Sequence, residues 1–486
     1  MNASVIVVGA GPAGLMLAGE LRLAGIDVTV LERLDSRTGE SRGIGLTART
    51  VEVFDQRGLL SRFGDLDTAT AGHFGGIPLD LTSLGTTVRS ARTVPQSVTE
   101  TVLESWARGL GADIRRGQEV TGVEDLGDRV TVRLGDSTEL TAAYLVGCDG
   151  GRSLVRKAAG FDFPGTSATT ELYLADLRGV DLQPRMIGEQ VDGGMVMCAR
   201  LPDGVTRVIV GERGVPPRRR TEPPAFAEVA DVWKRLTGVD ISHADPVWVS
   251  AFGDAARLVT EYRRGRVLLA GDAAHVHLPA GGQGMNTSIQ DSVNLGWKLG
   301  AVLRGTAPPS LLDTYHAERH AVGRRLLANT RAQSLFVLGG AEVAPLRELL
   351  GELVEYAEVE RLLAGRVSGL DIRYDVGGGT FPLLGARLPP LALRRDGREV
   401  TSAELLRTGR GVLLDLADNA ALRARAHPWT DRIDVITAVP QHLSPDDALY
   451  RTAAVLVRPD GHIAWAAPGS FHDLPMALDR WFGPAR

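Results

Sequence analysis

Cysteine is scarce in this sequence of 486 residues, which contains only Cys148 and Cys198. Two cysteines cannot build a disulfide framework, so we expect a reducing, cytoplasmic environment. Long apolar runs are also missing, since no stretch approaches the roughly 20 uninterrupted apolar residues of a membrane span. The apolar segment from Ala3 to Gly19 has no basic leader and is broken by a glycine-rich turn, which is not typical of a signal peptide.

Clusters of basic residues are few, and the longest Lys/Arg run is Arg218-Arg219-Arg220. Fifty-nine acidic residues against 54 basic ones give a net charge of −5, which does not favour nucleic acid as a partner. Hydrophobic residues make up 44% and charged residues 23%, the usual balance of a soluble globular chain. At about 150 residues per domain, the length predicts three domains. No membrane partner is expected, and a homo-oligomer is left open.

The N-terminal segment predicts a strand, a tight turn, a helix and a second strand. Val5–Val8 and Val28–Glu32 are rich in β-branched residues, and Leu15–Ala24 has leucines at helical spacing. Such a βαβ unit requires a parallel sheet.

Gly9-x-Gly11-x-x-Gly14 lies between the first strand and the helix, where a dinucleotide-binding fingerprint is expected. Gly9 permits the sharp turn, Gly11 lets the backbone approach a pyrophosphate, and Gly14 allows close helix–strand packing. Glu32 ends the second strand, where a carboxylate accepts hydrogen bonds from ribose and repels a 2′-phosphate. The fingerprint therefore predicts FAD or NAD. The residues expected to hold it are Gly9, Ala10, Gly11, Pro12, Ala13, Gly14, Glu32 and Arg33.

Two later strands also end in an aspartate. Asp149 closes a predicted strand that begins at Tyr144, and Asp272 follows a predicted strand over Arg266–Ala270. Ligands of parallel sheets bind at the carboxyl ends of the strands, so Asp272 could accept hydrogen bonds from the ribityl hydroxyls of a flavin. Either aspartate alone is a weak signal, but both of them after the fingerprint indicate FAD rather than NAD.

The rest of the chain predicts two further units. Between about residues 171 and 248, short strands such as Met195–Met197 alternate with turns, which is typical of an antiparallel sheet. Ser310 and Asp313 have a capping-box spacing that predicts the start of a long helix. The predicted organisation is a first part of the cofactor domain at 1–170, a middle sheet domain at 171–260, a second cofactor part with long helices at 261–376, a linker at 377–390 and a C-terminal domain at 391–486.

These motifs resemble those of the single-component FAD-dependent aromatic hydroxylases related to p-hydroxybenzoate and phenol hydroxylases. The resemblance covers nearly the whole chain and is closest to bacterial angucyclinone hydroxylases of the PgaE and CabE type. It is carried by Glu40–Gly43, Arg49-Thr50, Val94–Glu100 and Leu278–Thr287. It implies a Rossmann-like α/β FAD domain with an inserted antiparallel substrate sheet, followed by a C-terminal thioredoxin-like domain. That last domain lacks a redox Cys-x-x-Cys, which indicates a structural role.

The resemblance also implies cofactor contacts by position. Arg42 and Gln96 would contact the phosphate and ribityl parts of FAD, and the loop before Asn286 would lie against the isoalloxazine ring. Glycines in that loop permit close backbone approach, and the helix expected from about Asn286 would direct its positive end at the ring. The further contacts expected on these grounds are Asp149, Asp272, Pro279, Gly282, Gln283, Gly284, Met285 and Asn286.

The activity implied by the resemblance is that of a flavin monooxygenase with non-covalently bound FAD. NADPH or NADH would reduce the flavin, O2 would add at its C4a position, and the hydroperoxide would hydroxylate a polycyclic aromatic polyketide of angucyclinone type. The cofactor performs the difficult step, so no catalytic side chain is predicted.

Two alternatives remain open from the sequence. A Baeyer–Villiger oxygenase would use the same fold, with the peroxide attacking a ketone. A flavoprotein without oxygenase turnover could serve polyketide tailoring as a dehydratase or a binding partner, although the intact Asp272 and ring-loop glycines argue against it. An NAD dehydrogenase does not explain Gly271-Asp272, and a flavin halogenase would need a Trp-x-Trp-x-Ile-Pro signature that the sequence lacks.

Two pairs of residues have less specific patterns. His275 and His277 have the spacing of a metal-ligand pair, but no cluster of carboxylates or thiolates accompanies them, so no metal site is predicted. Met195 and Met197 point to one face of a strand, and that face is expected either to pack in the core or to line a pocket for an aromatic substrate.

Overall fold

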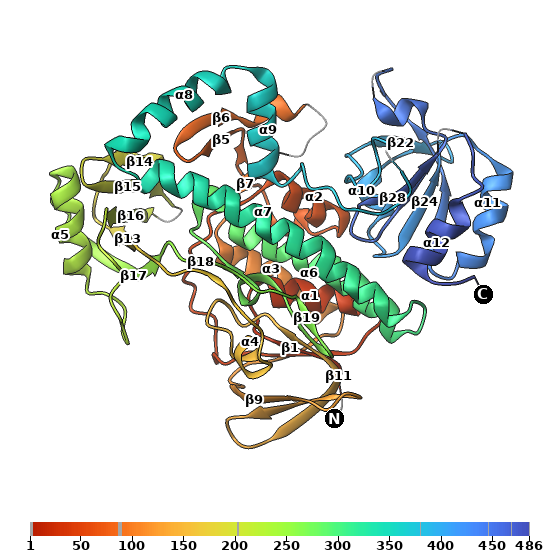
Figure 1. The fold of residues 1–486 in the computed structure, drawn as a ribbon, viewed down its shortest axis with the longest axis horizontal. Coiled ribbons are helices and arrows are strands. Elements are labelled where there is room, and N and C mark those ends of the chain that lie inside the picture. The colour runs from red at the N-terminus through yellow and green to blue at the C-terminus, as the bar shows by residue number, and fades with distance from the viewer. Residues whose placement is uncertain are drawn as a thin grey trace.

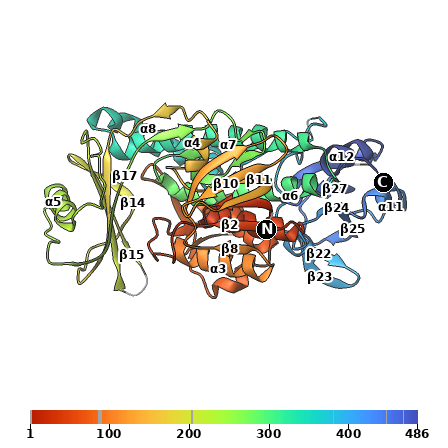
Figure 2. The ribbon, with the colours of Figure 1, turned by 90° about the horizontal axis from the view of Figure 1, so that it is seen from below.

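The structure of the protein is a computed structural model that describes residues 3–85, 90–201, 204–379, 381–445, 447–467 and 469–485. It has three parts side by side, as Figures 1 and 2 show from two directions. A central part contains the long helices α6 (Gln283–Leu303) and α7 (Asp313–Leu338). An antiparallel sheet flanks it on one side and a smaller α/β unit on the other.

The central sheet has the strand order β19-β20-β11-β1-β2-β8, and β10 and β9 extend it from β11. Strands β20, β11, β1, β2 and β8 run parallel, with Val7 opposite both Val146 and Val30. The parallel sheet predicted from the N-terminal βαβ unit is therefore confirmed. The strand bounds are β1 Ala3–Val8, β2 Val28–Leu31, β8 Asp113–Arg115, β9 Val120–Asp125, β10 Val130–Leu134, β11 Glu139–Gly147, β19 Arg263–Arg264 and β20 Val267–Leu269.

Helix α1 (Pro12–Leu23) packs against both α3 (Gln96–Gly109) and α6. Glycines make these contacts close. A Cβ on Gly19 of α1 would lie 2.0 Å from the Trp106 ring of α3, and a Cβ on Gly296 of α6 would lie 2.4 Å from the Glu20 side chain of α1. Helices α2 (Ala48–Gln56) and α4 (Leu154–Ala158) complete the central part near the sheet.

The starts of the two long helices differ from the predictions. Two consecutive glycines, Gly281 and Gly282, have φ of 65°, and α6 begins directly after them, three residues before the predicted start at Asn286. The capping box predicted at Ser310 does not form, because Ser310 lies in a short 3-10 turn over Pro309–Leu312 and α7 begins at Asp313 without a side-chain cap. The long helix predicted here is present and ends at Leu338.

The second part is a five-stranded antiparallel sheet with the order β14-β15-β16-β13-β17. Helix α5 (Phe226–Thr237) covers its outer face, and the opposite face is turned to the central part (Figure 2). Side chains alternate accordingly, with Val196 and Cys198 buried toward α5. The antiparallel sheet predicted here is confirmed. Its strands are β13 Glu171–Arg178, β14 Arg185–Val191, β15 Gly194–Arg200, β16 Thr206–Glu212 and β17 Asp245–Gly253.

The C-terminal unit contains a four-stranded mixed sheet with the order β25-β24-β27-β28, flanked by short helices. Strands β24 and β25 are parallel, β27 runs antiparallel to β24, and β28 runs antiparallel to β27. The elements are α10 Ser402–Leu405, β24 Gly411–Asp415, α11 Ala420–Ala426, β25 Ile433–Thr437, β27 Ala454–Val457, β28 Ile463–Ala467 and α12 Leu474–Phe482.

Short strands and two further helices complete the fold. Among the described residues, we find no helix with the length and apolarity needed to cross a bilayer. The remaining elements are β3 Gly45–Leu46, β4 Thr68–Ala69, β5 Ala71–Phe74, β6 Ile77–Asp80, β7 Ala91–Thr93, β12 Gly165–Thr166, β18 Ala256–Leu258, β21 His275–Val276, α8 Ala344–Val354, α9 Ala357–Ser368, β22 Ala392–Arg395, β23 Arg398–Thr401 and β26 Val439–Pro440.

A buried cluster of charges joins the C-terminal unit to the central part. Arg458, which follows β27, donates to both carboxylate oxygens of Glu318 in α7, at 2.6 and 2.9 Å. Lys298 of α6 donates to the same carboxylate at 2.7 Å, and Asp460 pairs with Arg458. The Arg458 guanidinium also lies 4.5 Å from the centre of the Trp481 ring. All four charged side chains are at most 4% exposed, so none has water to replace a lost partner.

Replacing Arg458 by methionine should therefore destabilise the protein strongly, because Glu318 and Asp460 would keep only Lys298 as a cation. We expect Arg458→Met to lower the free energy of unfolding by about 3–5 kcal/mol. The control is Arg133→Met, because Arg133 pairs with Glu139 at the surface with side chains 60% and 53% exposed; it should cost at most about 1 kcal/mol. Urea unfolding followed by circular dichroism measures both, and similar midpoints for the two variants would contradict this role of the cluster.

Candidate cofactor site

The turn between β1 and α1 is built by backbone contacts that exclude side chains. Gly9 has φ of 103° and donates its N–H to the Leu31 carbonyl at 2.8 Å. A Cβ on Gly9 would lie 2.4 Å from the Cys148 carbonyl oxygen, and one on Gly14 would lie 2.0 Å from the Gly9 carbonyl oxygen. Gly11 is different, because a Cβ there would meet no atom within 4 Å. The turn is thus closed around Gly9 and Gly14 and leaves open space at Gly11, at the N-terminus of α1.

Glu32 lies directly against this turn. One carboxylate oxygen accepts the Ala10 N–H at 2.8 Å, and the other accepts the Leu34 N–H at 3.0 Å. Each oxygen keeps a second acceptor position, and the side chain is only half-buried. The neighbouring Arg33 is exposed. Glu32 can therefore both hold the turn and accept a hydrogen bond from a ligand that lies on it.

Asp149 has a local role that the sequence did not reveal. Its carboxylate accepts the Ser153 hydroxyl at 2.6 Å and the N–H groups of Leu154 and Val155 at 2.7 and 3.1 Å. The two N–H groups belong to the first residues of α4 and have no acceptor within the helix, so the carboxylate caps the start of that helix. The cofactor contact expected for Asp149 stays a prediction, and the structure shows the residue as a helix-capping group.

Asp272 and Arg42 come from distant segments and interact electrostatically. Asp272 is exposed to solvent and accepts no hydrogen bond from any described residue, yet the surrounding protein raises the pKa of its carboxyl by desolvation, against the lowering effects of His275 and Arg42. Desolvation likewise lowers the pKa of Arg42, while the charge of Asp272 raises it. The Arg42 guanidinium donates to the Ser250 hydroxyl of the second sheet at 3.0 Å. An unsatisfied carboxylate in a crowded but solvent-accessible place is suited to accept hydrogen bonds from a polar ligand.

Gln96 holds the segment that carries Arg42. Its backbone N–H donates to the Gly43 carbonyl at 3.0 Å and to the Ser41 hydroxyl at 2.9 Å. The Gln96 amide donates to Glu100 at 2.8 Å in the next turn of α3. Gln96 and Arg42, which the sequence places 54 residues apart, are therefore neighbours at one edge of the central part.

The loop before α6 presents backbone rather than side chains. Pro279 and Gly282 are exposed, and the left-handed Gly281 and Gly282 turn the chain into the helix. Gly282 is the N-cap and no side chain caps the first N–H groups of α6. A helix of 21 residues thus begins with free N–H donors and the positive end of its dipole, which is suited to an electron-rich or anionic group.

The side chains of Asn286 and Gln283 hold this loop in place through hydrogen bonds. The Asn286 carbonyl accepts the Thr47 N–H at 2.9 Å, and its amide donates to the carbonyls of Gly282 and Gly45 at 2.8 and 3.2 Å. The Gln283 carbonyl oxygen accepts from the Asn329 amide at 3.0 Å. Both polar atoms of the Asn286 side chain are therefore engaged with protein, whereas Gln283 Nε2 has no protein partner. Met285 is half-buried beside them.

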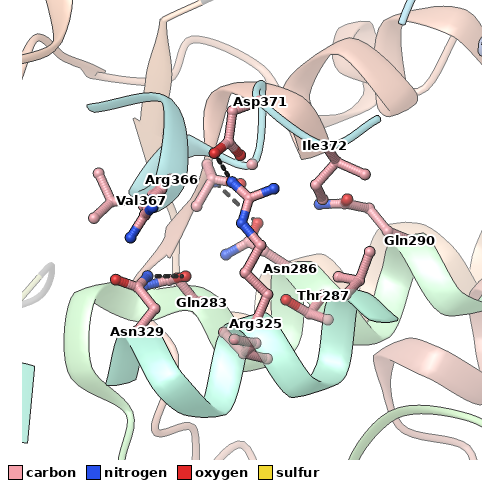
Figure 3. Close-up of a pocket in the computed structure, with 14 residues that line it drawn as sticks. Gln283, Asn286, Thr287, Gln290, Arg325, Asn329, Arg366, Val367, Asp371 and Ile372 are labelled. Carbon is pink, nitrogen blue, oxygen red and sulfur yellow. Dashed lines mark hydrogen bonds and ion pairs between the residues drawn. The ribbon is translucent and has the colours of Figure 1, made fainter. Parts of the chain in front are cut away.

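A small pocket with a mixed polar and apolar lining lies between α6, α7 and residues 366–372 (Figure 3). Gln283 and Asn329 face it from the two helices, and Arg325 of α7 reaches across it to Asp371. Its volume of about 50 Å³ holds only a few water molecules. Buried atoms of Gln283, Asn329 and the Thr47 hydroxyl have no protein partner there, which favours water as the occupant.

The two histidines are engaged separately. His275 Nε2 lies 2.8 Å from Asp291, whereas His277 Nδ1 lies 2.7 Å from the Leu278 carbonyl and therefore carries a hydrogen. Burial lowers the pKa of His277 to about 4, so its imidazole is neutral near pH 7. Within the part of the chain that the structure describes, His, Cys, Asp and Glu side chains form no group of three that could hold a metal ion.

Met195 and Met197 lie on the face of the second sheet that is turned to the central part. They belong to an apolar cluster that joins this sheet to the end of α7 and to the loop before α6. Met195 is buried and Met197 is half-buried. The two methionines therefore pack in an apolar cluster and also lie close to the loop before α6. The other members of the cluster are Leu172, Ile209, Phe252, Leu278, Ala280, Val337 and Leu338.

The separate motifs converge at the carboxyl edge of the parallel sheet. Gly9 contacts the end of β11 at Cys148, and Glu32 contacts the same turn through Ala10. A Cβ on Gly271 would lie 3.2 Å from the Ala13 side chain and 3.0 Å from that of Ser288, which places the turn before Asp272 between α1 and α6. The open space at Gly11, the unpaired Asp272 and the uncapped α6 are compatible with one extended dinucleotide along this edge.

Comparisons with known proteins agree with this arrangement. The FAD binding domain family matches residues 2–330, and the family described as the C-terminal part of aromatic-ring hydroxylases matches residues 381–485. The crystal structure of CabE, an aromatic hydroxylase from angucycline biosynthesis, has a TM-score of 0.97 and 62% identity, with all of both chains covered. The structure of BexE has a TM-score of 0.95 and 67% identity, also with full coverage of both chains.

Characterised relatives are similar over their full lengths. Rifampicin monooxygenase of Streptomyces venezuelae is 43% identical, covering 99% of each chain. A dialkyldecalin synthase of Streptomyces rugosporus is 42% identical, covering 100% of each chain. The second of these names does not describe an oxygen transfer, so similarity over the whole chain does not by itself fix the reaction.

Proposed function

The chain belongs to the family of FAD-binding aromatic-ring hydroxylases, and from that premise we propose that it hydroxylates a polycyclic aromatic polyketide of angucyclinone type, with NADPH or NADH as reductant and O2 as co-substrate. It is a flavin-dependent monooxygenase, as its relatives indicate. The similarity to CabE supports the angucyclinone substrate. Flavin, reductant and oxygen supply the reaction type, so the protein determines binding, orientation and access of water.

The carboxyl edge of the central sheet would hold FAD in an extended form. The open backbone at Gly11 and the start of α1 would bind the pyrophosphate, and Glu32 would accept hydrogen bonds from the adenosine ribose. Asp272 and Arg42 would contact the ribityl and phosphate parts in the middle. The free N–H groups at the start of α6 would face the pyrimidine side of the ring. The observation that supports this assignment is the unpaired, crowded carboxylate of Asp272 between the two helix starts.

When bound, FAD would be reduced by the nicotinamide and would then activate O2 for transfer of one oxygen atom to an aromatic ring. The apolar cluster on the second sheet would bind the substrate beside the ring. This cluster is continuous with the loop before α6, since Leu278 and Ala280 belong to both. An apolar wall at that place also excludes water, which limits loss of reducing equivalents to hydrogen peroxide.

The glycine turn offers a test that separates binding from folding. Gly11→Ala places a methyl group in open space, so the stability of the flavin-free variant should equal that of the flavin-free wild type. The methyl group would occupy the place proposed for the pyrophosphate, so FAD binding should weaken. In Gly14→Ala the Cβ would collide with the Gly9 carbonyl oxygen at 2.0 Å, so stability and FAD binding should both fall. Melting temperatures of the flavin-free variants and FAD titration by fluorescence quenching measure both properties. Unchanged FAD affinity in Gly11→Ala would place the pyrophosphate elsewhere.

Asp272→Asn should change stability and cofactor affinity in opposite directions. The raised pKa means that the ionised carboxylate is less favourable in the folded protein than in the unfolded chain, so the amide should leave the melting temperature of the flavin-free protein unchanged or higher. Loss of charge-assisted hydrogen bonds, at about 1.5–3 kcal/mol each, should weaken FAD binding tenfold or more. Asp128→Asn, an exposed carboxylate (73%) between β9 and β10, is the control and should alter neither. A wild-type FAD affinity in Asp272→Asn would show that the ribityl contact is misassigned.

The reaction itself is tested by product analysis. Protein, FAD, NADPH and 18O2 with an angucyclinone should give a product with one added 18O in a hydroxyl group, identified by mass spectrometry and NMR. Substrate-stimulated NADPH oxidation should accompany it. An 18O atom inserted into a ring as an ester would identify a Baeyer–Villiger oxygenase and contradict hydroxylation.

A flavoprotein without oxygen transfer is the second candidate, because a dialkyldecalin synthase is similar over the whole chain. The same experiment distinguishes it. A rearranged or dehydrated product without 18O, formed without NADPH oxidation, would support this candidate and contradict the monooxygenase.

A further inference from the structure

Asp291 is a fully buried carboxylate in α6, directly behind the turn that carries Asp272. One of its oxygens accepts the backbone N–H of Gly271 at 3.0 Å and lies 2.8 Å from Nε2 of His275. The other oxygen accepts a hydrogen bond from the Arg319 guanidinium of α7 at 2.6 Å. Asp291 thus joins three chain segments through one carboxylate, and it has no access to solvent.

The partners keep this carboxylate ionised. Burial alone would raise the pKa of Asp291, but the Arg319 and His275 charges and hydrogen bonds hold it below its usual value. His275 has no partner at Nδ1, so the hydrogen of its neutral form is carried by Nε2 and is donated to Asp291. Three donors therefore converge on Asp291, and an amide in its place could not accept all of them.

The backbone that Asp291 holds is a left-handed one. Gly271 has φ of 65°, and its N–H is the donor that fixes the orientation of the turn leading to Asp272. Because no described residue donates a hydrogen bond to the Asp272 carboxylate, its direction depends on this backbone anchor. A shift of the turn would move the Asp272 carboxylate away from the edge where the cofactor is expected.

Arg319 extends the network toward the C-terminal unit. It donates to the Tyr374 hydroxyl at 2.9 Å and to the Thr287 carbonyl in α6 at 3.2 Å. The Tyr374 ring lies 4.2 Å from the His462 ring and 5.1 Å from the Arg458 guanidinium, both of the C-terminal unit. The orientation of Arg319 is thus fixed from two sides by buried groups.

We propose that Asp291, oriented by Arg319 and Tyr374, is a positioning residue for the flavin: it holds the Gly271–Asp272 turn in the conformation that binds the ribityl chain. This inference rests on the proposed function, since it presumes that Asp272 binds FAD. Asp291 does not contact the cofactor itself. Its effect passes through one backbone hydrogen bond, and the C-terminal unit contributes through Tyr374.

The test compares FAD affinity with stability in matched variants. In Asp291→Asn, at least one of the three donors loses its acceptor, and we expect FAD binding to weaken about tenfold or more, with an altered visible circular dichroism spectrum of the bound flavin. Tyr374→Phe removes only the hydroxyl and should weaken FAD binding about two- to fivefold. The control is Trp429→Phe, which removes a buried hydrogen bond from Trp429 Nε1 to the Gly483 carbonyl at 2.8 Å within the C-terminal unit.

Trp429→Phe should lower the melting temperature but leave FAD affinity and the flavin spectrum as in the wild type. If Asp291→Asn binds FAD as tightly as the wild type, or if Trp429→Phe weakens binding as much, the positioning role is wrong. If Asp291→Asn does not fold, the FAD affinities of Tyr374→Phe and Trp429→Phe are compared instead. Equal affinities in those two variants would overturn the proposal. A wild-type protein that takes up no FAD would instead contradict the proposed function.

Discussion

The rest of the structure depends on close backbone contact between the turn after β1 and the turn after β11, at the carboxyl edge of one parallel sheet. Gly9 packs against the Cys148 carbonyl, and Gly14 packs against the Gly9 carbonyl, at distances that no side chain would permit. This contact fixes the direction of α1 and, through the packing of α1 against α6, the place at which α6 begins. Two helix starts with free N–H groups therefore face the same edge, which is the requirement for holding one long anionic cofactor.

Buried charge fixes the remaining parts relative to that edge. Glu318 and Arg319 are neighbours in α7, yet they bind in different directions, Glu318 to the C-terminal Arg458 and Arg319 to Asp291. Desolvation makes such pairs costly, so their value lies in specifying one arrangement rather than in adding stability. In this protein a single turn of α7 sets the position of both the C-terminal unit and the turn that carries Asp272.

Local patterns predicted much of the fold and of the candidate site, because strands and glycine turns are encoded by neighbouring residues. The parallel sheet, the antiparallel sheet and the edge at which the motifs meet follow from such patterns. Predictions about the partners of individual side chains were less complete, whether those partners lie a few residues away or far along the chain. Asp149 caps α4, Asn286 joins α6 to the loop at Gly45, and the capping box at Ser310 gives way to a 3-10 turn. No spacing rule identifies Asp291, whose importance arises from partners 20 residues before it and 28 residues after it.

The two faces of the second sheet belong to two different apolar clusters. Successive residues of β15 alternate, so Val196 and Cys198 pack beneath α5, while Met195 and Met197 join the apolar surface beside the ring loop. In the proposed function the flavin would supply the oxidising chemistry, so the choice of substrate would be made by the apolar surface beside it. A shift of one residue in the register of β15 would exchange the two faces, so it would disrupt the packing beneath α5 and the apolar surface beside the loop before α6 together.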